Sequence, residues 1–158
     1  MQMGMDREEG AVKAYESLTG DLLSHCGFVQ HTAVLAGCSP DGYLGDFDTI
    51  VSIKCRQPAA HLEFVRHATI PADALAQLRH EVWITGAERA VYFGWNPDFP
   101  AKLQSKAVTL TRKDLDIPAY EKEAMAFLAE VETEYQALRT ETELTAVLQE
   151  TVQQGGQL

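Results

Sequence analysis

The turn sequence SPDG at residues 39–42 is the feature that most constrains how this chain can fold. Proline presets φ, and aspartate and glycine tolerate a tight bend, so the β-prone residues on either side are predicted to form a hairpin. A GDFD connection at residues 45–48 then leads to a second strand, predicted over residues 49–55. Because side chains alternate along a strand, Ser52 and Lys54 are expected on one face and Ile53 on the other.

The rest of the chain alternates between helical and strand patterns. The further elements expected are helices at residues 5–18, 71–85 and 118–150 and strands at residues 89–95 and 105–111. The last helix is either continuous or broken near residues 140–142. It is expected to pack through an apolar stripe of Phe127, Val131, Tyr135 and Leu138. The order predicts an α/β fold with a mixed sheet flanked by helices and a long C-terminal helix.

Length and composition are typical of one domain. With 158 residues and 46% hydrophobic side chains, we expect a single domain over residues 1–150 and a disordered tail over residues 151–158. The sequence has no apolar run long enough for a membrane helix and no signal peptide pattern, which predicts a cytoplasmic protein without a membrane partner. The three cysteines are odd in number and lack CxxC spacing, so Cys26, Cys38 and Cys55 are predicted to be buried thiols.

The net charge of −10 is concentrated near the C-terminus. Residues 114–150 contain ten acids and two bases, a net charge of −8, which leaves −2 for residues 1–113. Residues 54–80 have a net charge of +2. A locally basic face is therefore compatible with binding to nucleic acid, although the whole chain is acidic.

Four segments, in this order and spacing, resemble a known nuclease family. They are GMDREEGAVKAYE, CSPDG, IVSIKC and ALAQLRHEVWITG. The chain resembles the restriction-endonuclease-like PD-(D/E)XK nucleases and, more narrowly, the YqaJ-like viral recombinase or phage lambda exonuclease family. The resemblance extends from about Gly4 to the C-terminal helix. It implies a restriction-endonuclease-like fold and a Mg²⁺- or Mn²⁺-dependent exonuclease of phage-type recombination that hydrolyses double-stranded DNA.

The resemblance also implies a set of metal ligands. Asp41 and the residue at position 52 would hold the metal, the backbone carbonyl of Ile53 would complete the protein ligands, and Glu8 would help to hold a second ion. Mg²⁺ prefers oxygen ligands of these kinds, and divalent metals make water nucleophilic near neutral pH.

The remaining site residues follow from the same resemblance. Together with Asp41, Lys54 and Gln77 would be catalytic: Lys54 would orient water or steady developing negative charge, and Gln77 would position the lysine or the water. Candidates for contact with DNA are Arg56, Arg79 and His80, with Arg79 replacing a glutamine of the family helix.

Ser52 departs from the family pattern, because a neutral hydroxyl stands where the signature has an acid. Three alternatives remain open. In the first alternative, catalysis is lost while the fold is retained. In the second, the acid is relocated to Glu81 on the helix predicted at residues 71–85. In the third alternative, Asp41, Glu8 and the Ile53 carbonyl support residual activity at high metal concentration.

Different kinds of protein are consistent with this pattern. The main alternative to an exonuclease is a catalytically inactive nuclease-fold protein that binds DNA or a recombination partner, such as a single-strand annealing protein. A structural subunit that pairs with an active copy is a third. The resemblance further implies a homo-oligomer, a trimer, and a helical region ahead of Gly4 that we expect this chain to lack.

Overall fold

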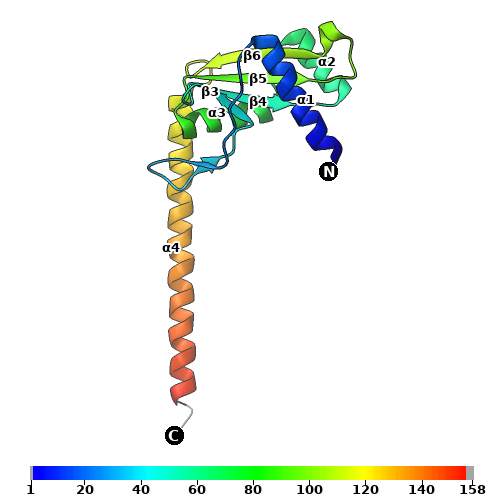
Figure 1. Cartoon of the computed structure of the whole chain (residues 1–158). Coiled ribbons are helices and arrows are strands. Elements are labelled where there is room, and N and C mark those ends of the chain that lie inside the picture. The colour runs from blue at the N-terminus through cyan, green and yellow to red at the C-terminus, as the bar shows by residue number, and fades with distance from the viewer. Residues whose placement is uncertain (1, 156–158) are drawn as a thin grey trace. The chain divides into compact units, whose positions relative to one another are not determined.

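A mixed four-stranded sheet forms the centre of the fold (Figure 1). The structure is a computed structural model that describes residues 2–155, with side chains described for residues 7–140. In sheet order the strands are β3 (Gly42–Leu44), β4 (Thr49–Lys54), β5 (Arg89–Trp95) and β6 (Ser105–Thr111). The central pair β4–β5 is parallel and the two outer pairs are antiparallel. The strands predicted at residues 89–95 and 105–111 are thereby confirmed, and β4 ends one residue earlier than predicted.

Helices cover both faces of this sheet. On one face, Tyr15 of α1 (Gln2–Thr19) packs edge-to-face against Phe93 of β5, with ring centroids 5.3 Å apart. On the other face, Phe64 of α2 (Pro58–His67) packs against Tyr92, with centroids 4.7 Å apart. Tyr92 and Phe93 are consecutive strand residues and therefore face opposite sides. Helix α3 (Ala72–Thr85) contacts β4 and β5 on the Tyr92 side. The predicted mixed sheet flanked by helices is confirmed.

The hairpin predicted around residues 39–42 is wrong. These residues join β2 (Gly37–Cys38) to β3, which belong to different sheets, and β2 pairs with β1 (Val29–Gln30). The β-prone stretch turns back on itself between these two strands, where the amide of His31 donates to the carbonyl of Ala36 at 2.8 Å. The antiparallel hairpin that enters the main sheet is β3–β4, connected through residues 45–48.

Helix α2 is not among the predicted elements. It begins with proline in its first turn, a known start signal, but His61 occupies a buried position and interrupts the apolar pattern. The helix ends at Ala68 in the left-handed conformation, with φ 56°, instead of at a glycine. A short 3₁₀ helix, η1 (Ala101–Leu103), precedes β6.

The long C-terminal helix is confirmed as α4 (Ile117–Gly155). It is continuous through residues 140–142, so the alternative with a break is wrong. Its predicted packing stripe is exposed: Phe127, Val131, Tyr135 and Leu138 are 46–63% accessible. With 39 residues, α4 is about 58 Å long. A seven-residue strand such as β5 is only about 23 Å long, so α4 is longer than any strand of the sheet.

The chain divides into two compact units, Met1–Tyr120 and Glu121–Leu158. The single domain expected over residues 1–150 stays a prediction, and residues 156–158 of the expected tail lie outside the described part. Within the described residues, no helix combines the length and the apolar character required to cross a membrane.

The three cysteines differ in environment. Cys38 is buried, Cys26 is partly buried and Cys55 is exposed. Burial, reinforced by the negative charge of Glu81, raises the pKa of the Cys38 thiol to about 12. The prediction that all three are buried is wrong for Cys55, which follows the last residue of β4 and is therefore no longer part of the sheet.

Candidate functional site

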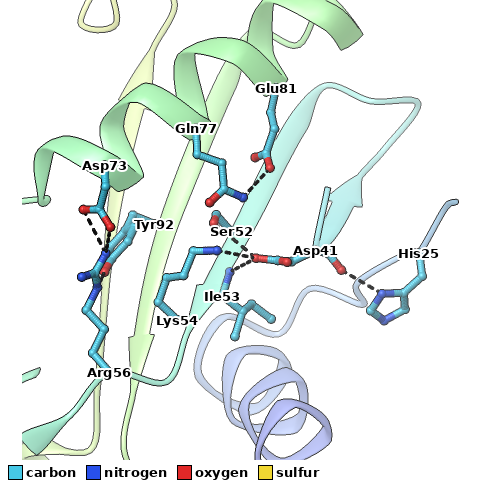
Figure 2. Close-up of polar contacts among 10 residues, drawn as sticks. All are labelled: His25, Asp41, Ser52, Ile53, Lys54, Arg56, Asp73, Gln77, Glu81 and Tyr92. Atoms are coloured by element: carbon cyan, nitrogen blue, oxygen red, sulfur yellow. Dashed lines mark hydrogen bonds and ion pairs between the residues drawn. The ribbon is translucent and has the colours of Figure 1, made fainter. Parts of the chain in front are cut away.

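Polar side chains from α3 and β4 meet on one face of the sheet (Figure 2). Gln77 and Glu81 are four residues apart and point to the same side of α3. Ser52 and Lys54 are two residues apart and share one face of β4. The chain ahead of β3 places Asp41 beside the same strand. The structure therefore brings together side chains that the sequence analysis singled out from a loop, a strand and a helix.

The carboxylate of Asp41 is held by three donors from β4. Its Oδ2 accepts hydrogen bonds from the Ile53 amide at 2.8 Å and the Ser52 hydroxyl at 3.3 Å. Lys54 Nζ lies 3.4 Å from the same oxygen and forms an ion pair with it. Both charged side chains are about one quarter exposed, 25% for Asp41 and 26% for Lys54. A ligand that reaches this site therefore meets a partly open carboxylate beside a fixed positive charge.

The backbone of Asp41 has a further partner that the sequence analysis missed. His25 Nδ1 lies 2.9 Å from the Asp41 carbonyl oxygen. A carbonyl only accepts, so Nδ1 carries the hydrogen in this contact. Nearby, Ser24 and Tyr43 exchange two backbone hydrogen bonds that tie this loop to β3. No sequence pattern connects residues 25 and 41, and the contact arises only when the two segments pair.

Ser52 is buried, with 1% of its surface exposed, and its hydroxyl is directed to Asp41. It supplies no charge to the site. The backbone of Ile53 contributes its amide to Asp41, and the role of its carbonyl as a metal ligand stays a prediction.

Glu81 is a buried acid on the helix side of the site. Only 2% of its surface is exposed, and its Oε1 accepts a hydrogen bond from Gln77 Nε2 at 2.7 Å. Its Oε2 is buried and has no hydrogen-bond partner among the residues whose side chains are described. Burial raises the pKa of Glu81 to about 7; the hydrogen bond from Gln77 and the charge of Lys54 oppose this shift, and the charge of Asp41 adds to it. Glu81 is therefore close enough to Asp41 and Lys54 to respond to both.

Glu8 lies on α1 and its side chain is exposed. Its connection with the other site residues is electrostatic. Although Cys55 is exposed as a residue, partial desolvation of its thiol is the largest cause of its raised pKa; the positive charge of Arg7 lowers this pKa, and the negative charges of Glu8 and Asp41 raise it further. Glu8 and Asp41 thus both influence the Cys55 thiol through their charge, and a ligand role for Glu8 stays a prediction.

The three candidates for DNA contact all have partners within the chain. Arg56 contacts Tyr92 and Asp73. Arg79 Nε donates to the carbonyl of Leu115 at 2.9 Å. The ring nitrogens of His80 lie 2.9 Å from the Tyr120 hydroxyl and 3.1 Å from the Gly37 carbonyl. Contact of these residues with DNA stays a prediction.

The carboxylate oxygens at the site are ligands of the kind that a hard divalent cation prefers. Among the residues whose side chains are described, no group of three or more His, Cys, Asp or Glu residues is close enough to hold a metal ion. Mg²⁺, however, is usually bound through one or two carboxylates, and water and substrate oxygens supply its other ligands. Asp41 and Glu81 provide two carboxylates. Among the described residues, Oε2 of Glu81 lacks the hydrogen-bond partner that a buried oxygen normally has.

Comparisons with known proteins agree with this architecture. The structure is similar to that of an alkaline exonuclease from Laribacter hongkongensis, with a TM-score of 0.80 and 27% identity over 87% of this chain and 71% of that one. The complex of the same enzyme with dAMP gives a TM-score of 0.80 and 28% identity over 90% and 73% of the two chains. A phage-related exonuclease from Haemophilus somnus 129PT shares the fold, with a TM-score of 0.57 and 16% identity over 82% and 72% of the two chains.

A search of curated proteins found no significant match. The family model of the YqaJ-like viral recombinase domain matches residues 1–88, more than half of the chain. The family resemblance found in the sequence is thereby confirmed, and this chain belongs to the YqaJ-like viral recombinase domain family.

Proposed function

We propose that this chain is a metal-dependent exonuclease that hydrolyses phosphodiester bonds of double-stranded DNA, with Glu81 in place of the acid missing at Ser52. Family membership and the similarity to an alkaline exonuclease support the reaction class. Both carboxylates needed for one metal ion come from this chain, Asp41 from the loop before β3 and Glu81 from α3.

The state of Glu81 is the observation that carries this proposal. A buried carboxyl group normally has a partner for each oxygen, yet Oε2 of Glu81 has none within the described residues. The group also responds to the charges of Asp41 and Lys54. A cation between Glu81 and Asp41 would supply the missing partner and offset the cost of burying an ionised carboxylate.

Each residue of the site has a distinct role in this proposal. A bound Mg²⁺ or Mn²⁺ would neutralise phosphate charge and make a water nucleophilic near neutral pH. Asp41 and Glu81 would hold the ion, with the Ile53 carbonyl as a further oxygen ligand. Gln77 orients the Glu81 carboxyl group through its hydrogen bond. Lys54 balances the negative charge that develops on phosphate oxygens during hydrolysis.

Glu8, on α1, is proposed to help hold a second ion. A single-strand annealing protein as partner and a homotrimer as assembly are likewise proposed on the ground of family membership.

The bonding of Asp41 favours a second candidate function. Its Oδ2 already has three donors, including the positive charge of Lys54, so the carboxylate is neutralised without a metal. A chain in this state would be a catalytically inactive nuclease-fold protein that binds DNA or a recombination partner.

One assay separates the two functions. End-labelled duplex DNA is incubated with the purified chain in Mg²⁺ or Mn²⁺, and release of nucleotides is followed with and without EDTA. The exonuclease proposal expects metal-dependent degradation that Glu81→Gln reduces at least about 100-fold, because even outer-shell partners of metal ligands cost about 10–100-fold when mutated. Glu63→Gln on α2 is the matched control, since Glu63 is exposed and pairs only with His67 among the described contacts. Duplex binding without degradation would favour the inactive binder.

A further inference from the structure

A second polar cluster lies at the start of α3, outside the proposed metal site (Figure 2). Arg56 Nε donates to the Tyr92 hydroxyl at 2.7 Å. Arg56 Nη2 lies 3.1 and 3.3 Å from the two carboxylate oxygens of Asp73. One guanidinium group therefore joins the end of β4, the buried strand β5 and the first turn of α3.

The spacing in the chain connects this cluster to the site. Arg56 is two residues beyond Lys54, and Asp73 is one helical turn before Gln77 and two before Glu81. Asp73, Gln77 and Glu81 therefore lie along one side of α3. Figure 2 shows all three side chains directed from α3 toward the strands. A shift at the first turn of the helix would displace Gln77 and Glu81 with it.

Two of the three residues that contact Arg56 are buried, whereas the side chain of Asp73 is 72% exposed. Tyr92 is fully buried and pairs with Ser52 in the β4–β5 ladder. The carbonyl of Arg56 accepts a hydrogen bond from Asn96 Nδ2 at 3.2 Å, and Asn96 is 1% exposed. Both the backbone and the side chain of Arg56 are thus fixed to buried residues.

The charges of the cluster are mutually satisfied. Burial lowers the pKa of the Arg56 guanidinium, and the bonds to Tyr92 and Asp73 outweigh this effect and raise it. The hydrogen bond from Arg56 is the largest cause of the lowered pKa of Asp73. A planar guanidinium that contacts two partners through separate nitrogens fixes their geometry in a way that a lysine ammonium does not.

We infer that Arg56, with Asp73 and Tyr92, is a positioning residue that holds the first turn of α3 on β4 and β5 and thereby keeps Gln77 and Glu81 over Lys54 and Asp41. This inference rests on the proposed metal site. It differs from the hypothesis that Arg56 binds DNA phosphate, because the guanidinium already has two partners within the chain.

Asp73→Asn distinguishes the two roles. If Arg56 binds phosphate, removal of the neighbouring negative charge frees the guanidinium and tightens binding of duplex DNA. If Arg56 positions α3, the same change loosens the first turn and weakens metal binding. Arg56→Gln should then give the same defect, and the double variant should be no worse than Arg56→Gln alone.

Two measurements on the whole chain report these effects without catalysis. Hydrogen exchange is followed at the amide of Leu75, which donates to the Pro71 carbonyl at 2.9 Å at the start of α3. Mn²⁺ affinity is measured by calorimetry in the absence of DNA. We expect faster exchange at Leu75 and about tenfold weaker Mn²⁺ binding in Arg56→Gln and Asp73→Asn, the lower end of the range for outer-shell partners. Arg56→Lys should recover part of the affinity, because it keeps the charge but not the planar fork.

Controls separate positioning from a general loss of stability. Arg89→Gln removes an arginine that bonds Thr49 across β4 and β5 at 3.3 Å, and it should leave Leu75 exchange and Mn²⁺ affinity unchanged. The salt dependence of duplex binding should have the same log–log slope in Arg56→Gln as in the unaltered chain, whereas loss of a phosphate contact would reduce the slope by about 0.9.

The opposite results overturn the inference. These are unchanged exchange at Leu75, faster exchange with unchanged Mn²⁺ affinity, or tighter duplex binding by Asp73→Asn together with a reduced slope for Arg56→Gln. If the unaltered chain binds no Mn²⁺, the proposed metal site fails. Hydrogen exchange at Leu75 then decides whether the cluster holds α3, and unchanged exchange in the variants would show that it does not.

Discussion

Some properties of the single residues at the site can be predicted from the sequence, and others depend on how the chain folds. Asp41 and Lys54 were singled out through the order and spacing of four segments that resemble a nuclease family, and the structure brings the two side chains together. The spacing of Glu81 from Gln77 predicted that both lie on the same side of α3. The burial of Glu81, and the lack of a hydrogen-bond partner for its Oε2 among the described residues, depend on how α3 packs over β4. The contact between His25 and the Asp41 carbonyl has no sequence signal at all.

Returning the acid to the strand should compensate for its removal from the helix. Ser52→Glu is expected to restore nuclease activity to Glu81→Gln, because the carboxylate again lies beside Asp41. Activity is measured on labelled duplex with Mn²⁺. Ser52 is buried, so the melting temperature of each variant is recorded to confirm folding. A folded double variant that is as inactive as Glu81→Gln would contradict the idea that an acid at position 52 can replace the acid at position 81.

The free energy of unfolding should depend on pH through Glu81. Burial raises the pKa of this group from 4.5 to about 7 in the folded chain, so the folded state retains a proton that the unfolded state has lost. The contribution of Glu81 to stability therefore falls as the pH rises from 4.5 to about 7 and is constant above that range. The loss is at most about 3 kcal/mol.

Urea unfolding in EDTA at pH 5 and pH 8 measures this effect. Glu81→Gln should be less dependent on pH than the unaltered chain and more stable than it at pH 8. Glu63→Gln, which changes an exposed acid, should keep the original dependence. Equal pH dependence in Glu81→Gln and the unaltered chain would show that Glu81 titrates normally.

At the scale of elements, the long strands and helices were predicted well, whereas the short helix α2 and the pairing of the strands were not. Strands β5 and β6 have long β-prone runs between clear breaks, and α3 has apolar residues at helical spacing before Gly86. Helix α2 was missed because it is short, contains the buried polar residue His61 and ends at Ala68 where a glycine is the usual signal. Which strand pairs with which depends on contacts distant in sequence, so the hairpin at residues 39–42 was misassigned.

The two helix ends offer a matched test of backbone conformation. Ala68 and Gly86 both end a helix in the left-handed region, with φ 56° and 75°. Ala68→Gly should stabilise the chain by about 0.5–1 kcal/mol, and Gly86→Ala should destabilise it by about 1 kcal/mol, because only glycine adopts this region without strain. A Cβ at Gly86 would have open space around it, so its effect reports backbone strain alone. Urea unfolding at fixed pH gives both values, and effects of the same sign would refute this explanation.

For binding of DNA by the whole molecule, the distribution of charge along the chain matters more than the net charge. Residues 114–150 account for −8 of the total of −10, and the site residues lie in the unit that ends at Tyr120. The sequence predicted this asymmetry directly, since it requires only counting. It did not predict that candidates for contact with DNA, such as Arg56 and Arg79, have intramolecular partners.

Binding of duplex DNA should accordingly be weak and sensitive to salt. Residues 54–80 have a net charge of only +2, so few phosphate contacts are expected. Log Kd should rise with log salt concentration with a slope of about 0.9 for each of these contacts. Fluorescence anisotropy with a labelled duplex, in EDTA to prevent cleavage, measures the slope. Binding that does not vary with salt would contradict a phosphate-based contact.

The raised pKa of Cys38 makes the three cysteines chemically distinguishable. With a thiol pKa of about 12, only about one molecule in 10⁴ has a thiolate at this position at pH 8. The pKa of Cys55 is also raised, but this cysteine is exposed, so in a Cys26→Ser variant alkylating reagents added under native conditions should spare Cys38 and modify Cys55. A maleimide dye can thus be attached beside the end of β4, where its emission would report what arrives at the neighbouring carboxylates.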